Sequence, residues 1–317
     1  MEKARRLIQL IALFAANPWL LSSWRGGAPI YRGALKHLCF PGLNCYSCPA
    51  ATMACPLGAI QNFITGFRMN LQAGLFHPGI YVAGSLGLVA SFLGRAPCAW
   101  LCPFGLFQEV VYKLPVRKRD IWRPLRYGRH VMLVFFVLLL PFFLTDTAGY
   151  GVTWFCKFVC PAGTLEAGFP LLLLEPSLRD TLGLLFFHKV VVLALIISWS
   201  AVTLRPFCRT LCPLGLLLGF FNRASWLRLH FESAKCVECR VCTAICPAGV
   251  SFFDGRDDIN SSHCIRCMRC LNFCPGASVR LSFSPVRKEF EYEKKENCAC
   301  HREHGQGEGD DKPAGTL

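Results

Sequence analysis

Residues 235–247 read KCVECRVCTAICP and residues 263–275 read HCIRCMRCLNFCP. Each half has the form C-x2-C-x2-C-x3-C-P, and a spacer of ordinary length joins the two. Three thiolates spaced two residues apart can curl around one iron–sulfur cubane, and the following Cys-Pro sends the chain on toward a second one. In this run the fourth cysteine of each half ligates the cluster of the other half. The stretch therefore predicts two 4Fe–4S clusters in one small α+β unit.

The spacing also predicts how the eight cysteines divide. The first cluster takes Cys236, Cys239, Cys242 and Cys274, and the second takes Cys264, Cys267, Cys270 and Cys246. Zinc is the alternative, because C-x2-C pairs also make tetrahedral sulfur sites. Such sites close with two pairs and need neither a third cysteine nor a Cys-Pro in each half. We therefore favour iron–sulfur clusters over zinc.

The composition indicates a membrane protein that works in a reducing compartment. Of 317 residues 53% are hydrophobic and only 17% are charged, which is less than the usual quarter of a soluble domain. Twenty cysteines would suit a short secreted disulfide scaffold, but this chain is long and apolar. The formal charge of +14 arises from basic residues beside apolar runs, which is typical of cytoplasmic membrane loops. Nucleic-acid binding is not expected.

Apolar runs predict four membrane spans. A cleaved signal peptide is the alternative for the first run, but no small-residue cleavage site follows it. Lys and Arg concentrate before the first span, between the second and third, and after the fourth, which places both termini and the cysteine-rich unit in the cytoplasm. The localisation expected is a multi-pass protein of the bacterial or archaeal cytoplasmic membrane. The four runs are Leu7 to Leu21, Gly79 to Leu93, Val131 to Leu144 and Leu182 to Leu204.

A second cysteine pattern recurs four times outside the eight-cysteine stretch. The copies read ACPLGAIQNF, LCPFGLFQEV, VCPAGTLEAG and LCPLGLLLGF, and each opens an apolar stretch with Cys-Pro-x-Gly. Proline favours the first position of a helix, whose N-terminus then turns N–H groups and a positive dipole end toward an anionic cluster. The repeated cysteines are Cys55, Cys102, Cys160 and Cys212.

Three copies carry another cysteine four residues earlier, namely Cys98, Cys156 and Cys208. In the first copy that position is Ala51, and Cys45 and Cys48 stand further upstream. One pair of thiolates is half a ligand set, so two pairs make a 4Fe–4S site.

The predicted topology pairs the copies across the membrane. The second and fourth lie on the cytoplasmic side and together hold one cluster at Cys98, Cys102, Cys208 and Cys212. The first and third lie on the outer side, where a further cluster takes four of five cysteines. A disulfide between Cys156 and Cys160 is the main alternative there, and buried unligated thiols are another. The five outer cysteines are Cys45, Cys48, Cys55, Cys156 and Cys160.

With these motifs the chain resembles the membrane polyferredoxins of the NapH and NosR type over about residues 75 to 283. The resemblance rests on the Cys98/Cys102 pair before Pro103, the Cys208/Cys212 pair before Pro213 and the eight C-terminal cysteines. It implies electron transfer between the quinone pool, or a membrane redox partner, and a cytoplasmic or periplasmic oxidoreductase. The motifs around Cys45–Cys55 and Cys156/Cys160 are additions to the family pattern.

Two histidines and a C-terminal tract are weaker candidates. His77 and His188 lie near the outer ends of the second and fourth spans, where ordinary interfacial histidines are expected; a quinone contact is the functional alternative, and a haem is not expected. Lys189 is expected to extend its charge outward. The tail from Val286 on is expected to be disordered, and Cys298, Cys300, His301 and His304 resemble a metal-binding tract.

The sequence thus predicts a membrane all-α bundle of about four transmembrane helices, followed by a C-terminal α+β ferredoxin-like domain with two 4Fe–4S clusters. The predicted boundaries are 1–228 for the membrane domain, 229–285 for the ferredoxin-like domain and 286–317 for the tail. The predicted function is membrane electron transfer as a subunit of an oxidoreductase system rather than stand-alone enzymatic catalysis. A maturation factor that supplies electrons for metallocofactor insertion is the alternative.

Overall fold

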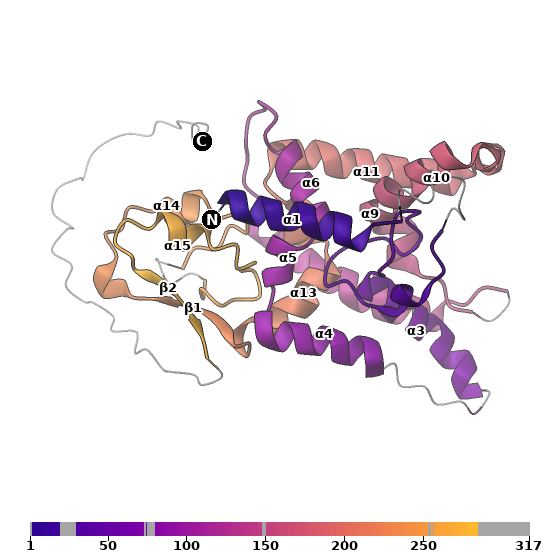
Figure 1. The fold of residues 1–317 in the computed structure, drawn as a ribbon, viewed down its shortest axis with the longest axis horizontal. Coiled ribbons are helices and arrows are strands. Elements are labelled where there is room, and N and C mark those ends of the chain that lie inside the picture. The colour runs from indigo at the N-terminus through magenta and orange to yellow at the C-terminus, as the bar shows by residue number, and fades with distance from the viewer. Residues whose placement is uncertain are drawn as a thin grey trace.

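A computed structural model describes residues 2–19, 30–72, 74, 80–147, 150–252, 255 and 257–284. The predictions for residues 20 and 21 of the first span, for His77 and for the tail from residue 286 lie outside these ranges. Figure 1 shows an elongated molecule. Helices run along its long axis, and a small two-stranded unit caps one end.

Four helical runs correspond to the predicted spans. Two of the described runs are long and apolar enough to cross a membrane: residues 123–143, with 21 residues, and α11, with 19. Two are shorter, α1 with 15 residues and α4 with 14. The structure therefore supports the third and fourth spans by length, while the first and second stay predictions. The bounds are α1 Glu2–Ala16, α4 Ile80–Leu93, residues 123–143 (η2 Arg123–Tyr127, α7 Gly128–Val131, η3 Met132–Leu139, α8 Leu140–Phe143) and α11 Leu184–Val202.

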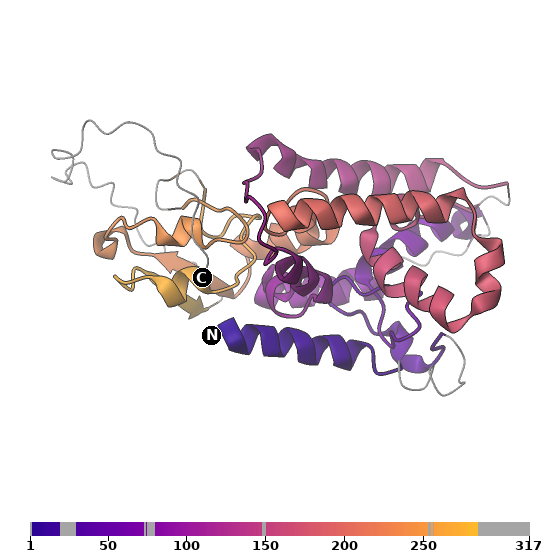
Figure 2. The ribbon, with the colours of Figure 1, turned by 90° about the horizontal axis from the view of Figure 1, so that it is seen from above.

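The long helices connect the two ends of the molecule. Helix α1 begins beside the C-terminal unit, where Glu2 pairs with Arg269 at 3.1 Å. It ends where the Ala16 carbonyl accepts the Thr52 N–H at 3.0 Å, in the loop before Cys55. Figure 2 shows α1, α11 and residues 123–143 extending along the same long axis. Each helix thus passes from one group of cysteines to the other.

Each of the four Cys-Pro-x-Gly copies begins a helix, as the repeat predicts. Proline occupies the first position in every case, and Cys102, Cys160 and Cys212 are the extended N-cap residues. Fixed proline φ suits this position, where the missing N–H is not needed. The helices are α3 Pro56–Gln72, α6 Pro103–Val111, α9 Pro161–Gly163 (continued by η5 Thr164–Gly168 and α10 Phe169–Leu174) and α13 Pro213–Phe220.

The earlier cysteine of three copies lies in a short helical turn of its own. The N–H of the second cysteine donates a hydrogen bond to the carbonyl five residues before it. This bond closes the turn and holds the two cysteines close together. The bonds run from Cys102 to Pro97 (3.1 Å), from Cys160 to Phe155 (2.8 Å) and from Cys212 to Phe207 (2.9 Å). The turns are α5 Ala96–Trp100, η4 Phe155–Val159 and α12 Pro206–Thr210, of which η4 is a π-helix. Three 3-10 turns lie elsewhere in the helical part, η1 Ala34–His37, η6 Pro176–Thr181 and η7 Phe221–Arg223.

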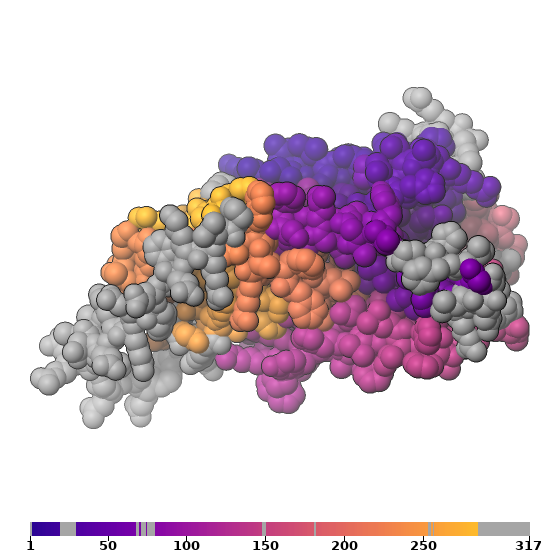
Figure 3. All heavy atoms as spheres, turned by 90° about the horizontal axis from the view of Figure 1, so that it is seen from below, coloured from indigo at the N-terminus to yellow at the C-terminus, as the bar shows by residue number. Residues whose placement is uncertain are grey.

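The C-terminal unit joins two antiparallel strands to two short helices. Strand β1 (Leu227–Phe231) pairs with β2 (Val279–Phe283), with Leu229 opposite Leu281. Between them lie η8 (Ser233–Lys235), α14 (Val241–Ala244) and α15 (Arg269–Phe273). Their small core contains Leu229, Val250, Ile265, Met268 and Val279. Figure 3 shows the orange and yellow atoms of this unit packed directly against the purple and magenta atoms of the helical part.

Candidate iron–sulfur sites

The first predicted cysteine set lines one hollow of the C-terminal unit. Cys236, Cys239, Cys242 and Cys274 all border a space of about 370 Å³ that is partly open to solvent. Cys274 accepts the Ser278 N–H at 3.4 Å, and its Sγ lies 3.0 Å from the Ser278 hydroxyl. Burial alone would raise the pKa of the Cys274 thiol, but the hydrogen bonds from Ser278 and from the neighbouring backbone N–H groups together lower it. Cys274 of the second half thus lies beside three cysteines of the first half.

The second set lines a neighbouring hollow of about 400 Å³, which Cys246 reaches from the first half. Burial, together with the nearby Cys246 and Cys267 thiols, raises the pKa of the Cys264 thiol to about 12. Burial and the Cys264, Cys267 and Cys246 thiols likewise raise the pKa of Cys270. Four neighbouring thiolates repel one another. They are stable together only when they bind a cationic metal core, which displaces the protons of the thiols.

Both halves bend the backbone in the same way between their cysteines. Glu238 and Arg240 have φ of 51° and 57°, and the equivalent Arg266 and Met268 have φ of 52° and 60°. Non-glycine residues rarely adopt this left-handed conformation, which costs free energy. The strain turns consecutive cysteines toward one point, and the internal symmetry explains the shared spacing.

The inner set comes together at the junction of α5, α6, α12 and α13. Cys98, Cys102, Cys208 and Cys212 are all buried, with 4–8% of their surface exposed. Burial raises the pKa of the Cys102 thiol, and the adjacent Cys208 and Cys98 thiols raise it further. The N–H groups of Gly105 and Gly215 point at the sulfurs of Cys102 and Cys212. The two predicted pairs thus form one site to which two helix N-termini contribute.

Buried arginines surround the inner set. Arg95 Nη2 donates to the Cys208 carbonyl at 2.7 Å, and Arg205 Nη1 donates to the Cys98 carbonyl at 2.9 Å. A Cβ on Gly215 would lie 2.5 Å from Arg95 Nη2, so the glycine of this copy makes room for the guanidinium. Glycine is needed wherever a side chain must approach the backbone this closely. These cations offset the negative charge that four thiolates bring.

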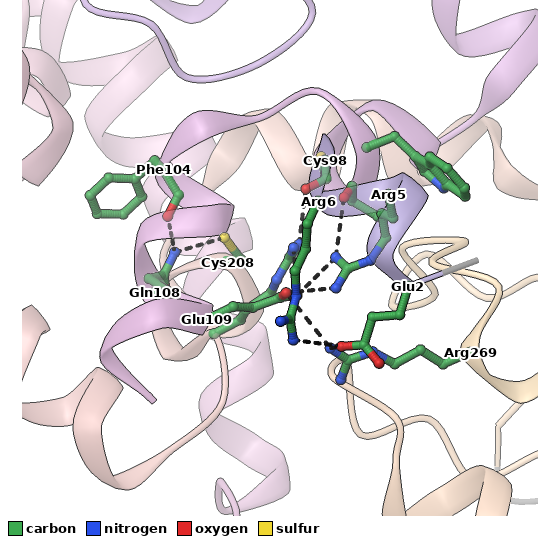
Figure 4. A network of polar contacts seen from close by, with 12 residues as sticks. Glu2, Arg5, Arg6, Cys98, Phe104, Gln108, Glu109, Cys208 and Arg269 are labelled. Atoms are coloured by element: carbon green, nitrogen blue, oxygen red, sulfur yellow. Dashed lines mark hydrogen bonds and ion pairs between the residues drawn. The ribbon is translucent and has the colours of Figure 1, made fainter. Parts of the chain in front are cut away.

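Glu109 forms ion pairs with three arginines, two of which, Arg5 and Arg269, are labelled in Figure 4. Its carboxylate pairs with Arg5 at 2.6 Å, with Arg205 at 2.7 Å and with Arg269 at 3.6 Å. Although burial alone would raise it, the charges of Arg205, Arg5 and Arg269 lower the pKa of Glu109 to about 2. The neighbouring Gln108 donates from Nε2 to Cys208 Sγ at 3.1 Å. One turn of α6 therefore links α1, the inner cysteines and the C-terminal unit.

Further arginines bind the C-terminal unit to the helices. Arg95 and Arg129 both donate to the Ser262 carbonyl, at 2.9 and 3.1 Å, and Arg126 donates to the Gly249 carbonyl at 2.5 Å. Arg266 donates to the Leu93 carbonyl at the end of α4. The sequence indicated only that basic residues concentrate between the second and third spans. Their bonds to carbonyls of the C-terminal unit were missed, because a basic run gives no sign of which carbonyl it will meet.

The five outer cysteines lie around the starts of α3 and α9. Burial raises the pKa of the Cys160 thiol to about 11, and the nearby Cys55 thiol and Glu166 carboxylate raise it further. Cys156 has Cys160, Cys55 and Cys45 as neighbours. All five are free thiols, so the predicted disulfide alternative is not formed here. Lys189 does not extend its charge away from this group. Its Nζ lies beside the start of α9, 3.4 Å from the position that a Cβ on Gly163 would take.

The arrangement fits a cluster better than a single ion. Around one zinc ion the sulfurs lie about 2.3 Å from the metal, and hence roughly 3.8 Å apart. Within the described ranges, no three His, Cys, Asp or Glu side chains lie close enough to hold one metal ion. The wall of the first C-terminal hollow nevertheless carries four cysteines and that of the second carries five, because Cys242 borders both. The donor set is all sulfur, which suits an iron–sulfur cluster.

Sequence comparison agrees with this chemistry. A family model described as "4Fe-4S binding domain" matches residues 53–73, 77–121 and 185–232, and one described as "4Fe-4S dicluster domain" matches residues 228–275. The first match contains the prolines after Cys55 and Cys102 and the inner pair at Cys208 and Cys212, and the second contains all eight C-terminal cysteines. The chain is thus an iron–sulfur polyferredoxin that is similar to the NapH/NosR type.

Curated relatives of this polyferredoxin come from several organisms. An uncharacterized protein of Methanocaldococcus jannaschii is 28% identical over 64% of the chain and 76% of its own length. The methylamine utilization ferredoxin-type protein MauN of Methylorubrum extorquens is 29% identical, over 56% of the chain and 57% of MauN. The regulatory protein NosR of Pseudomonas aeruginosa is 25% identical, over 70% of the chain and 30% of NosR. No solved structure matches the chain.

The remaining candidates play smaller parts. His188 lies at the start of α11 with Nε2 3.1 Å from the Phe158 carbonyl, so its ring has an ordinary backbone partner. The polyferredoxin is an iron–sulfur electron-transfer protein. Sequence reasoning missed Gln108 and Glu109, although both lie in a repeat copy, six and seven residues after Cys102.

Proposed function

We propose that this polyferredoxin spans a membrane and transfers electrons between a quinol or another membrane redox partner and a cytoplasmic or respiratory oxidoreductase. The cysteines hold two clusters in the C-terminal unit and one or two more at the ends of the helical bundle. Each cluster supplies one-electron exchange when bound. The protein fixes the sites, excludes water from them and sets their electrostatic surroundings.

The surface of the long helices supports a membrane location. The most apolar windows of residues 123–143 and of α11 are only 28% and 22% buried inside the molecule. Phe135 and Phe143 are 52% and 65% exposed, and Leu195 is 64% exposed. Helices at the core of a soluble protein bury such side chains, whereas lipid receives them without cost. Two helices from this group already provide the length of a span of about 30 Å.

The observation that carries the relay proposal is the contact between the inner site and the second C-terminal site. Trp100, two residues after Cys98, donates its Nε1–H to the Arg266 carbonyl at 3.0 Å, and Arg266 directly precedes Cys267. Arg205, which bonds the Cys98 carbonyl, also has Cys267 among its charged neighbours. The two ligand sets therefore adjoin through the Trp100 hydrogen bond and the Arg205 guanidinium. Arg95 joins them as well, because it donates to the Cys208 carbonyl at 2.7 Å and to the His263 carbonyl at 3.1 Å.

The buried arginines make that contact rigid. Arg5, Arg95, Arg129, Arg205 and Arg266 are each at most 2% exposed. Buried charges of this kind are stable only when they are paired or hydrogen-bonded. Fixed geometry suits electron transfer, because the distance between sites is then constant and little reorganisation follows a change of charge.

Electron transfer across lipid vesicles tests the proposal. The purified protein is reconstituted with an acceptor dye trapped inside, and a quinol or a membrane-impermeant reductant is added outside. We expect reduction of the dye with the loaded wild type and its loss with Cys98→Ser. Cys39→Ser is the control, because Cys39 belongs to none of the cysteine sets. Fully loaded protein that leaves the dye oxidised with both reductants would contradict the proposal.

A further inference from the structure

The outer site has five candidate cysteines for four ligand positions, and they come from two parts of the chain. Cys45, Cys48 and Cys55 precede α3, and Cys156 and Cys160 precede α9. The family match begins at residue 53 and omits residues 122–184, so it assigns only the surroundings of Cys55. The four ligands must therefore be chosen from the structure.

The first guide is a repeated contact between motif copies. The residue six positions after the Cys-Pro cysteine is Gln61 in the first copy and Glu166 in the third. Gln61 Oε1 accepts the N–H of Cys156 at 3.1 Å. Glu166 Oε2 accepts the N–H of Cys45 at 2.7 Å. Each copy thus holds the backbone of the leading cysteine of its partner.

Because the two contacts are reciprocal, Cys45 corresponds to Cys156 as the leading cysteine of its copy. In the first copy the expected leading position is occupied by Ala51, which is fully buried and has no sulfur. The inner site shows a related contact, since Gln108, six residues after Cys102, donates to the sulfur of the leading cysteine Cys208. Cys45 therefore replaces the missing cysteine through a longer loop.

The position of the Cys45 sulfur agrees with this role. A Cβ on Gly163 would lie 3.6 Å from Cys45 Sγ, which places that sulfur at the N-terminus of α9 beside Cys160. The N–H of Gly163 points at the Cys160 sulfur. Cys55 in turn receives the N–H groups of Gly58 and Leu57 at the start of α3.

Cys48 faces another way. Its Sγ lies 3.9 Å from Asn17 Oδ1, beyond the end of α1, and its side chain packs with Ala50 and Ala51. Cys45 packs against the same group, but its thiol also interacts with those of Cys160 and Cys156. Cys55, Cys156 and Cys160 instead pack in or against the main core of the helical part.

We propose that Cys45, Cys55, Cys156 and Cys160 ligate an outer 4Fe–4S cluster and that Cys48 does not, an inference that rests on the proposed function. Loading a preformed cluster exchanges four S–H bonds for four Fe–S bonds. Four protons leave to solvent, and no iron changes its oxidation state. Lys189 lies beside this site and offsets part of its negative charge.

Iron and acid-labile sulfide per chain test the assignment, measured on the full-length protein purified without oxygen. The wild type is expected to carry about sixteen irons. Cys45→Ser, Cys55→Ser, Cys156→Ser and Cys160→Ser are each expected to lose about four, whereas Cys48→Ser keeps the wild-type count. The paramagnetic signals of the C-terminal clusters report whether each variant is folded. Native mass spectrometry of the wild type needs no variant and is expected to count four clusters.

Other results separate the two proposals. A wild type with about twelve irons, unchanged in all the outer variants but reduced by Cys98→Ser, would overturn the outer cluster alone. Loss of iron in Cys48→Ser with a full count in Cys45→Ser would overturn the choice of ligands. About eight irons, unchanged by Cys98→Ser as well, would overturn the proposed function itself.

Discussion

The inner and outer cysteine sets share one construction but differ in their surrounding charges. Both join two Cys-Pro-x-Gly helix starts, and both use the residue six positions after the cysteine to contact the partner copy. Arg95 and Arg205 bond directly to backbone carbonyls of the inner set. The outer set has the buried carboxyl group of Glu166 against the Cys45 backbone and two nearby ammonium groups, those of Lys189 and Lys36.

This difference predicts that the two sites have different reduction potentials. A cluster gains negative charge on reduction, so neighbouring cations raise its reduction potential and neighbouring anions lower it. A unit charge roughly 6 Å away in a medium of effective dielectric about 20 contributes about 3 kcal/mol, or roughly 100 mV for one electron. We therefore expect the inner site to have the higher potential. Electrons would then pass from the outer site toward the C-terminal unit.

The two sets also differ in what they adjoin. The inner set contacts the C-terminal unit through Trp100 and Arg205, whereas the outer set lies at the far end of the helices in Figure 1. The repeat thus supplies two similar sites, and the residues around each copy give them different roles. The predictions that follow test this contrast.

Removing an inner ligand is expected to have the largest effect. Cys102→Ala leaves three thiolates, so the inner cluster is lost with about four irons per chain. Electron transfer from the outer side to the C-terminal clusters should then fall by at least about 100-fold, because the remaining sites lie on opposite sides of a core about 30 Å thick. Stopped-flow reduction of the C-terminal clusters measures this. Cys39→Ala should leave both readouts unchanged, and rapid transfer in Cys102→Ala would show that the inner site is not on the path.

Loss of the buried carboxylate should destabilise the inner junction. Glu109→Gln leaves Arg5, Arg205 and Arg269 without their shared partner, and breaking a buried pair costs about 3–5 kcal/mol. Urea unfolding in detergent, followed by the loss of cluster absorbance, measures the effect. Asp258→Asn removes the exposed pair with Arg223 and should change the midpoint much less. Equal midpoints for both variants would mean that the Glu109 network does not stabilise the junction.

The same carboxylate predicts an acid-sensitive junction. The pKa of Glu109 falls from its ordinary value of 4.5 to about 2 in the folded protein, so its stabilisation is fully present above pH 4.5. It is lost as the pH falls from 4.5 toward 2, and amounts to about 3 kcal/mol. Unfolding midpoints measured between pH 6 and 3 should therefore decline more steeply for the wild type than for Glu109→Gln. Parallel declines would contradict this assignment.

Gln108→Leu is expected to have the smallest effect, on the potential alone. It removes the hydrogen bond to Cys208 Sγ, which stabilises the more negative reduced state. A bond stronger by about 1–2 kcal/mol in that state corresponds to a fall of roughly 40–90 mV. Gln61→Leu is the matched variant, because Gln61 bonds a backbone N–H at the outer set and not a sulfur. A redox titration in which Gln61→Leu shifts the inner signal as much as Gln108→Leu would overturn this distinction.

The ligand sets were the most predictable part of the molecule. Cysteine spacing is local, and the crossing of Cys246 and Cys274 between halves follows from the motif. The four helix starts also followed from Cys-Pro-x-Gly, because proline and the N-cap act within one turn. The two longest apolar helices appear where hydropathy placed them.

Long-range polar contacts could not be predicted in the same way. Arg95 binds Ser262 across 167 positions of the sequence, and Arg5 binds Glu109 across 104. The runs that contain these arginines read as membrane-flanking bases, since hydropathy does not show which bases become buried. The left-handed backbone conformation of Arg266 and Met268 could not be predicted either. Neither residue type prefers this conformation, and the surrounding site holds them in it. The choice of Cys45 over Cys48 also required the fold.

Paramagnetic resonance of the reduced protein tests the central claim most directly. If the inner cysteines hold a cluster beside the site of Cys246, Cys264, Cys267 and Cys270, the two reduced clusters interact magnetically. The account predicts split and broadened signals in the wild type that become a sum of independent signals in Cys208→Ala. Identical spectra for the two proteins, with the same iron content, would contradict it.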